Sequence, residues 1–217
     1  MDILFEDNDL LAINKPAGLS TESGRALHPS AEKEALQYLL QKGNKAPAKK
    51  MPYLRAVHRL DRAASGVLLL AKSKQVLSNL MAQFERHTVE KVYVAEVAAP
   101  PAEAGGALRH FLKRTSDGKS ALVFDNPVDG SQAAALRYLV LKKKTGSAIL
   151  EIFPASGRFH QIRAQLAHIG CPITGDVRYG GPFWREHAIK LHARRLVIRH
   201  PKRDETLVIE APLPAIW

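Results

Sequence analysis

The longest uninterrupted apolar run of the chain is short, and a polar turn leads into it. The run VLLLA covers residues 67–71 and follows the segment HRLDRAASG at residues 58–66. A run of this length is far too short to cross a bilayer, whereas a buried strand is commonly apolar at every position. We therefore expect a buried strand here, with polar residues placed at the edge of a sheet just before it.

Most of the remaining apolar pattern is also typical of strands. Residues 3–14 predict two short strands joined by polar turn residues, and KVYVAEVA at residues 91–98 predicts a strand by its alternation. Residues 100–150 are strand-like with Gly, Pro and Asp turns, and residues 191–214 predict a hairpin that turns at residues 201–205. Strands are therefore expected to outnumber helices.

Helical spacing of apolar residues predicts three helices. Ser30 is expected to cap the first, which runs to about Gln41 with Gly43 just beyond its end, and Ser73 is expected to cap the second. The apolar stripe of the second helix is expected to consist of Leu77, Leu80, Met81 and Phe84.

The third helix is expected over about residues 158–169, with Gly170 as its stop signal. Its apolar side would carry Phe159, Ile162, Leu166 and Ile169. Because no βαβ alternation runs through the chain, the pattern predicts an α+β fold, with a mainly antiparallel (mixed) sheet and a few flanking helices. One domain over residues 1–217 is expected, with two small domains as the alternative.

The charge balance gives the first indication of a partner. The chain of 217 residues has 32 Lys and Arg against 21 Asp and Glu, a formal net charge of +11. Excess cations attract polyanions, so nucleic acid is the first candidate, followed by an acidic membrane surface and an acidic protein. A solvated basic face without a specific ligand is the alternative.

The cysteine content and the N-terminus predict where the protein works. Cys171 is the single cysteine, so it cannot form an intramolecular disulfide or a thiolate-rich zinc site, which fits a reducing compartment. The first ten residues, MDILFEDNDL, are acidic where a secretory signal is basic. We therefore expect a cytoplasmic protein without a membrane segment.

Three polar segments stand where an apolar core is otherwise expected. Asp61 precedes the buried strand, where it could face a cleft or simply cap a turn. Tyr93, in the same strand face as Lys91, could stack on a base or simply pack with its hydroxyl in water. Arg163 lies at the margin of the third helix's apolar stripe, so it needs an anionic partner, for which Asp61 is the candidate.

Other chemical sites lack their sequence patterns. The nine histidines form no HExxH motif, and the acidic residues do not repeat at metal-ligand spacing, so no metal is expected. The chain has no Walker loop and no GxGxxG, so no nucleotide cofactor is expected either. Ser65 lacks the pattern of a nucleophile elbow and is interpreted as a turn residue.

Three segments in one order, HRLDRAASG, KVYVAEV and GRFHQIRAQLAHIGCPITGD, resemble the ribosomal large subunit pseudouridine synthase A-like family. NKPAG at residues 14–18 and the later LHA and HP match it as well, so the likeness runs from about Ile3 to Pro214. It implies the pseudouridine synthase fold with a central RNA-binding cleft. It also implies a bare catalytic domain, without the N-terminal RNA-binding domain that some members carry.

The resemblance implies that the protein isomerises selected uridines in structured RNA, ribosomal or transfer RNA, without a cofactor. Asp61 falls on the family's catalytic aspartate, which acts as nucleophile on the ribose or as the base that starts glycal formation. Arg163 falls on the arginine that pairs with this aspartate, and Tyr93 on the tyrosine that stacks on the target uracil. The family also suggests a monomer.

The resemblance places Arg59 in the space that the flipped uridine leaves, and Arg62 and Lys91 are expected to contact RNA as well. The chain departs from the family at Ala64, Phe159, Gln165 and Cys171, which leaves the target RNA open. A non-catalytic RNA-binding or RNA-folding protein that uses the same cleft is the alternative function. Further cations that would hold phosphates are Lys45, Lys49, Lys50, Lys113, Arg114, Lys142 to Lys144, and Arg199 to Arg203.

Overall fold

The computed structural model describes residues 1–23, 28–43 and 51–217. The chain forms two compact units, one made of Met1–Glu90 and Ala193–Ile216, the other of Lys91–His192 and Trp217. The expectation of a single domain stays a prediction. Among the described residues, no helix is both long enough and apolar enough to cross a membrane.

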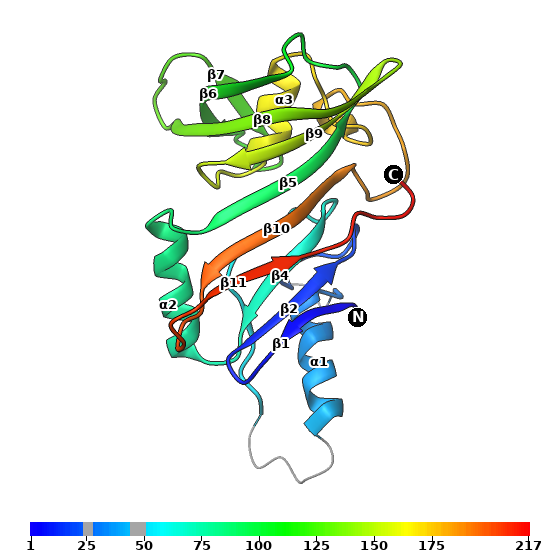
Figure 1. The fold of residues 1–217 in the computed structure, drawn as a ribbon. Coiled ribbons are helices and arrows are strands. Elements are labelled where there is room, and N and C mark those ends of the chain that lie inside the picture. The colour runs from blue at the N-terminus through cyan, green and yellow to red at the C-terminus, as the bar shows by residue number, and fades with distance from the viewer. Residues whose placement is uncertain (24–27, 44–50) are drawn as a thin grey trace. The chain divides into compact units, whose positions relative to one another are not determined.

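The first unit is built on a β-sheet (Figure 1). Its strands run in the order β1-β2-β4-β10, with β3 beside β4 and β11 beside β10. The pairs β1/β2, β2/β4 and β10/β11 are antiparallel, which confirms the two predicted hairpins. The bounds are β1 Ile3–Glu6, β2 Leu10–Lys15, β3 Arg55–Ala56, β4 Ser65–Ala71, β10 Leu191–Arg199 and β11 Thr206–Glu210.

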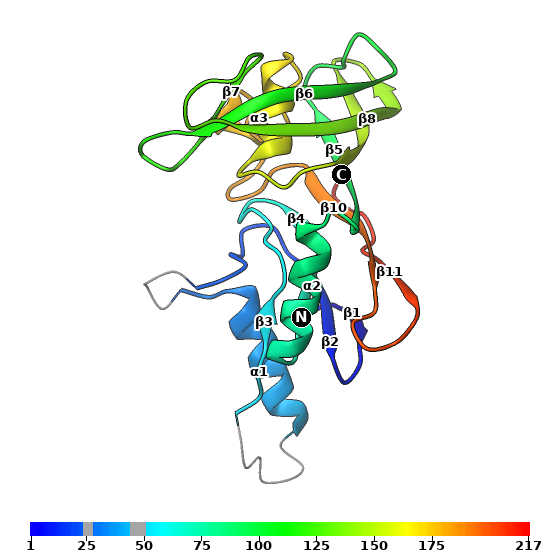
Figure 2. The same ribbon diagram turned by 90° about the vertical axis from the view of Figure 1, so that its left-hand side faces the viewer.

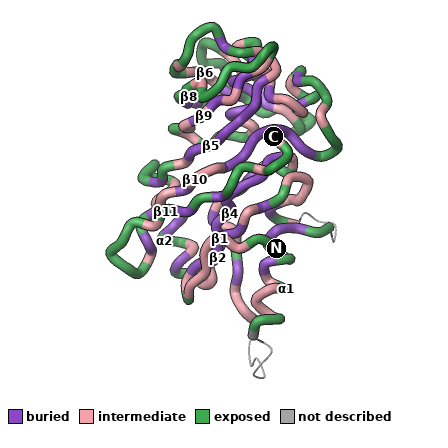
Figure 3. The backbone as a smooth tube through the Cα atoms, turned by 45° about the vertical axis from the view of Figure 1, so that its right-hand side comes forward, coloured by how far each residue is buried: buried purple, intermediate pink, exposed green. Residues whose placement is uncertain are grey.

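Strand β4 is the centre of this unit. Every residue of β4 is buried, as the purple tube of Figure 3 shows, so both faces of the strand are covered. Helix α2 (Lys74–Glu85) packs Val76 and Leu80 into a core shared with Leu69 of β4 and Leu10 of β2. The predicted buried strand is therefore confirmed, because an apolar residue at every position suits a strand covered on both sides.

The two helices of this unit begin where the sequence predicts and differ in detail. The Ser73 hydroxyl accepts the Val76 N–H at 3.3 Å, and the Ser30 hydroxyl accepts the Lys33 N–H at 3.3 Å. Helix α1 (Ala31–Gly43) includes Gly43, so it ends later than expected. Met81 is 53% exposed, because it points about 100° away from Leu80, which is fully buried; the predicted stripe is wrong at this position.

The second unit is an antiparallel sheet, with strand order β5-β9-β8-β6-β7. Its strands are β5 Glu90–Val97, β6 Gly105–Arg114, β7 Ala121–Phe124, β8 Gln132–Lys144 and β9 Ser147–Pro154. Helix α3 (Gln161–His168) packs against β6 and β7, and Figure 2 shows it behind these strands. A short 3₁₀ helix follows at Val177–Tyr179. This arrangement confirms the α+β class.

Helix α3 starts three residues later than the expected residue 158. His160 is left-handed, with φ of 53°, and the Gln161 side chain accepts the Arg158 N–H at 3.0 Å, so residues 158–160 form a turn before the helix. Phe159 is 38% exposed and lies outside the apolar stripe. Gly170 has a φ of 75° and does end the helix, as predicted.

Candidate active site

Asp61 lies in the polar turn directly before β4, neither fully buried nor exposed. Its carbonyl accepts the Ala64 N–H at 3.1 Å, which closes the turn. Gly66 follows with a φ of 114°, and a Cβ added to it would lie 2.3 Å from the Ala193 carbonyl oxygen of β10. The sequence DRAASG thus forms a tight turn that only glycine can complete next to β10.

Residues 15–21 form hydrogen bonds to this turn. The Thr21 hydroxyl accepts the Leu60 N–H at 3.1 Å and donates to the Leu60 carbonyl at 2.9 Å, so both polar groups of Leu60 are satisfied by one side chain. The Gly18 N–H donates to the Arg62 carbonyl at 2.7 Å, and Arg62 Nε donates to the Gly18 carbonyl at 2.8 Å. The residues on either side of Asp61 are therefore fixed through the backbone.

Lys15 is the most unusual residue near this turn, because its exposed fraction is 0%. Its ammonium donates to the carbonyls of Pro16 at 2.9 Å, Leu19 at 2.8 Å and Arg62 at 3.4 Å. Burial lowers the pKa of Lys15 from 10.5 to about 8, although the charge of Asp61 acts in the opposite direction. Lys15 therefore places a cation beside Asp61 and ties three backbone carbonyls together.

The two arginines that flank Asp61 differ in their surroundings. The Arg59 side chain is 77% exposed, and its Nη1 lies 3.8 Å from a Glu22 carboxylate oxygen. Such a solvated ion pair contributes little to the stability of the fold. Arg62 is exposed but uses Nε to bind Gly18. An extended, solvated guanidinium suits an RNA contact, so Arg59 is the better placed of the two for the role predicted from the sequence.

In the second unit, Arg163 of α3 is buried with an anionic partner that the sequence interpretation did not name. Its Nε donates to Asp176 Oδ2 at 2.6 Å and its Nη2 to Oδ1 at 2.9 Å. The side chains are 7% and 2% exposed, and the Tyr179 ring lies 5.1 Å from the guanidinium carbon. Asp176 takes two of the five N–H donors, so the ion pair orients the guanidinium plane.

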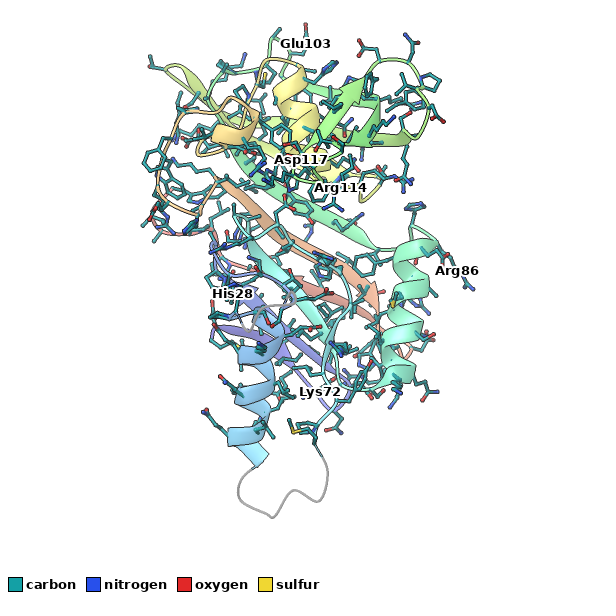
Figure 4. All side chains as sticks on the ribbon, turned by 180° about the vertical axis from the view of Figure 1, so that it is seen from behind. His28, Lys72, Arg86, Glu103, Arg114 and Asp117 are labelled. Atoms are coloured by element: carbon teal, nitrogen blue, oxygen red, sulfur yellow. The ribbon has the colours of Figure 1, made fainter. Side chains whose placement is uncertain are left out.

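Tyr179 extends this cluster to the turn before α3. Its oxygen accepts the Ala121 N–H at 2.7 Å and lies 3.0 Å from His160 Nδ1, within hydrogen-bonding distance. The rings of Phe159 and His160 stack with centroids 3.8 Å apart. The guanidinium of Arg114, a residue labelled in Figure 4, lies over the Phe159 ring, with its carbon 4.2 Å from the ring centroid. The turn thus presents stacked planar groups beside Arg163.

Tyr93 and Lys91 lie on β5, where Tyr93 is paired with Ile152 of β9. Both are intermediate in burial, and the neighbouring Val92 is buried, which fits the predicted alternation. Burial lowers the pKa of Lys91, and its ammonium lies 3.5 Å from the Ser156 carbonyl. RNA binding by Lys91 stays a prediction. Its side chain is less exposed than that of Arg59.

Several of the predicted phosphate-binding cations already have partners within the protein. Lys144 binds Glu96, Arg199 binds Asp204, and Arg203 binds Asp7. Lys45, Lys49 and Lys50 lie outside the described residues. The excess positive charge is therefore used in part for structure, and exposed cations such as Lys143 are the better candidates for RNA contacts.

The structure brings the predicted residues together in two groups. Asp61, Arg59 and Arg62 share one turn of the first unit, whereas Tyr93, Lys91 and Arg163 belong to the second unit. The pairing of Arg163 with Asp61 would join residues of different units and stays a prediction. Sequence reasoning missed Lys15, Thr21 and Asp176, although NKPAG contains the first and the segment ending in TGD contains the last.

The chain matches the family model described as RNA pseudouridylate synthase over residues 9–168. It is 33% identical over 223 residues to a ribosomal large subunit pseudouridine synthase C from Buchnera aphidicola, covering 99% of this chain and 68% of the relative. It is also 33% identical over 237 residues to a tRNA pseudouridine synthase C from Vibrio cholerae, covering 100% of this chain and 93% of the relative.

A solved structure has a similar fold. The human RNA pseudouridylate synthase domain containing 4 superposes with a TM-score of 0.79 at 26% identity, covering 99% of this chain and 89% of the other. The matched family region includes Asp61, Tyr93 and Arg163, together with Lys15.

Proposed function

The chain belongs to the RNA pseudouridylate synthase family, and we propose that it converts uridine to pseudouridine through Asp61. The observation that carries this role is the geometry of the turn at Asp61. Thr21 and Gly18 hold the residues before and after it through their backbone atoms, and Lys15 supplies a buried cation beside it. A fixed carboxylate next to a buried cation is ready to react without reorganising its surroundings.

The reaction is an isomerisation, so no group is gained or lost. The bond from ribose C1′ to uracil N1 breaks, the base turns, and a bond from C1′ to C5 forms, while C5 loses a proton and N1 gains one. Asp61 either attacks the ribose as nucleophile or removes a ribose proton to start glycal formation. In both routes the reacting form of Asp61 is the carboxylate.

We assign Tyr93 to the target base and Arg163 to the carboxylate. A tyrosine ring can stack on uracil, and its hydroxyl can take part in moving the C5 proton. Asp176 engages Nε and Nη2 of Arg163 and so orients the guanidinium. The resemblance of GRFHQIRAQLAHIGCPITGD to the family supports Asp61 as a further carboxylate partner of Arg163. Removing a uridine from a stem costs a few kcal/mol, and the exposed Arg59 is proposed to fill its place.

The substrate is proposed to be ribosomal or transfer RNA, as the names of the relatives suggest for those proteins. Within the family, we propose the ribosomal large subunit pseudouridine synthase A-like group, because HRLDRAASG and KVYVAEV match it. A cytoplasmic location and a monomeric state stay predictions.

The test maps pseudouridine across total RNA from cells with and without the gene, and then treats the RNA of the deletion cells with the purified protein. We expect at least one pseudouridine to vanish in the deletion and to return after treatment. RNA binding by the purified protein without any change in the pseudouridine map would contradict the enzyme and favour the alternative, an RNA-binding or RNA-folding protein.

A further inference from the structure

His110, Asp125 and His168 come together at the end of α3 that is opposite to its His160 turn. His110 is on β6, Asp125 directly follows β7, and His168 is the last residue of α3. Their ligand atoms all lie within 4.8 Å of one another, and among the described residues no other group of His, Cys, Asp and Glu is as closely gathered for a metal. The function proposed above uses none of the three.

We infer that His110, Asp125 and His168 form a binding site for a divalent transition-metal ion of the Zn²⁺ class. Two imidazoles and one carboxylate are the donor set that such ions prefer. The inference goes against the sequence-based expectation of no metal, which looked for ligands at short spacing. The ligands here are far apart in the chain and are brought together by the sheet and α3.

Two of the three donor separations are close to those expected around a tetrahedral ion, and the third is within 4.8 Å. Ligands about 2.0–2.1 Å from such an ion lie roughly 3.3 Å from one another. The structure has 3.0 Å between His168 Nε2 and Asp125 Oδ1, and 3.8 Å between His110 Nε2 and the same oxygen. The side chain of Asp125 is 74% exposed, so it can rotate to bring its oxygen to the ion, and the ion can enter from solvent.

Gln165 provides a second and independent observation. It is fully buried, its Nε2 lies 3.0 Å from His110 Nδ1 and 3.3 Å from the Ala134 carbonyl, and its Oε1 is buried with no hydrogen-bond partner. A histidine that binds a metal through Nε2 donates its Nδ1–H to an oxygen. If the amide turns over, Oε1 accepts this N–H, while Nε2 gives up its 3.3 Å bond to the Ala134 carbonyl and takes the buried position that Oε1 now holds.

The position of the site in the fold also favours a cation. His168 ends α3, and the last carbonyls of a helix carry partial negative charge. An ion held by the three ligands would join the end of α3 to β6 and to the residue after β7. We therefore expect the metal to stabilise the second unit rather than to take part in the isomerisation.

The test uses the full chain after chelation, titrated with ZnCl2 by calorimetry and with Co²⁺, whose visible absorption reports the ligand geometry. We expect one ion per chain, a tetrahedral Co²⁺ spectrum, and a higher Tm with Zn²⁺. His168→Gln and Asp125→Asn should each weaken Zn²⁺ binding at least tenfold. Their matched controls are His28→Gln and Asp129→Asn, at exposed positions outside the cluster, and these should bind like the wild type.

Circular dichroism of each metal-free variant checks that it is folded, which is expected because Asp125 and His168 are not buried. No bound Zn²⁺ in the wild type would overturn the inference. Binding that His168→Gln and Asp125→Asn leave unchanged would overturn it as well, because the ion would then be adventitious.

Discussion

The turn that carries Asp61 and the cluster that carries Arg163 are held in place in opposite ways. Around Asp61 the neighbours Thr21, Gly18 and Lys15 bind backbone groups, and the Asp61 carboxylate takes no part in these bonds. Arg163 is itself the structural element of its cluster, because its side chain neutralises the buried Asp176. We therefore expect a substitution at Asp61 to keep these backbone bonds, whereas a substitution at Arg163 leaves Asp176 buried without its arginine partner.

The largest effect that separates the two regions is expected for Asp61→Asn. Asparagine keeps the size of the side chain and removes the ionised carboxylate, so pseudouridine formation should be abolished. Tm and RNA affinity should stay near those of the wild type, because the turn is fixed through the backbone of Leu60 and Arg62. Turnover with purified RNA, thermal unfolding and filter binding measure the three quantities.

The matched control for that variant is Asp129→Asn, an exposed carboxylate whose side chain lies outside the turn. It should keep full activity. A large fall in the Tm of Asp61→Asn would contradict this difference between the two regions, because the carboxylate would then help to hold the turn.

The next largest effect is expected for Arg163→Met, and it concerns stability as well as activity. Without the guanidinium, Asp176 is a buried and unpaired charge at 2% exposure, and breaking such a pair costs about 3–5 kcal/mol. The free energy of unfolding, from urea titration, measures this loss. The double variant Arg163→Met/Asp176→Leu should recover much of the stability while remaining inactive; a double variant no more stable than the single one would contradict the structural role.

Lys15 gives the turn a characteristic dependence on pH. Its pKa is about 8 in the folded protein against 10.5 for the ordinary side chain, so between these values the unfolded chain binds more protons. Stability contributed by Lys15 therefore rises from about pH 8 to pH 10.5, by roughly 3 kcal/mol at most. Unfolding free energies of wild type and Lys15→Met across this range should show that the variant lacks this rise; parallel curves would refute the assignment.

A smaller effect is expected for Thr21→Val, which keeps the shape of the side chain and removes both bonds to Leu60. The buried N–H and carbonyl of Leu60 lose their partner, which costs about 1–3 kcal/mol. Because the turn at Asp61 loosens, kcat should fall while RNA affinity is kept. Thr88→Val, at an exposed threonine of the same unit, is the control; equal changes in both variants would argue against a positioning role.

The smallest effect is expected for Lys143→Gln, at an exposed position of β8. If this lysine contacts phosphate, its loss reduces the slope of log affinity against log salt by about 0.7–0.9 and leaves kcat unchanged. The neighbouring Lys144 is bound to Glu96, so Lys144→Gln should change the salt dependence less. Equal slopes for Lys143→Gln and the wild type would remove Lys143 from the RNA-binding surface.

Much of the fold follows from local signals in the sequence. The hairpins at both ends of the chain, the buried strand β4 and the Ser73 cap depend on periodicity and on residues close in the chain, and the structure confirms them. The start of α3 was predicted too early, because the left-handed His160 and the Gln161 side chain stop the helix from extending further back.

The candidate site was predicted only in part, because its partners are distant in the chain or hidden by burial. Asp61, Tyr93 and Arg163 were found through motifs, and their roles stay predictions. Lys15 ends the mostly apolar strand LLAINK, and nothing local shows that its ammonium binds carbonyls. Asp176 lies thirteen residues after Arg163, beyond the reach of helical spacing, so only the folded chain shows the pair.

The most direct test of the central claim is to express Asp61→Asn in cells that lack the gene and to map pseudouridine in their RNA. We expect the wild-type chain to restore each lost site and Asp61→Asn, present at the same level, to restore none. A pseudouridine restored by Asp61→Asn would contradict it, because the catalytic carboxylate would then lie elsewhere.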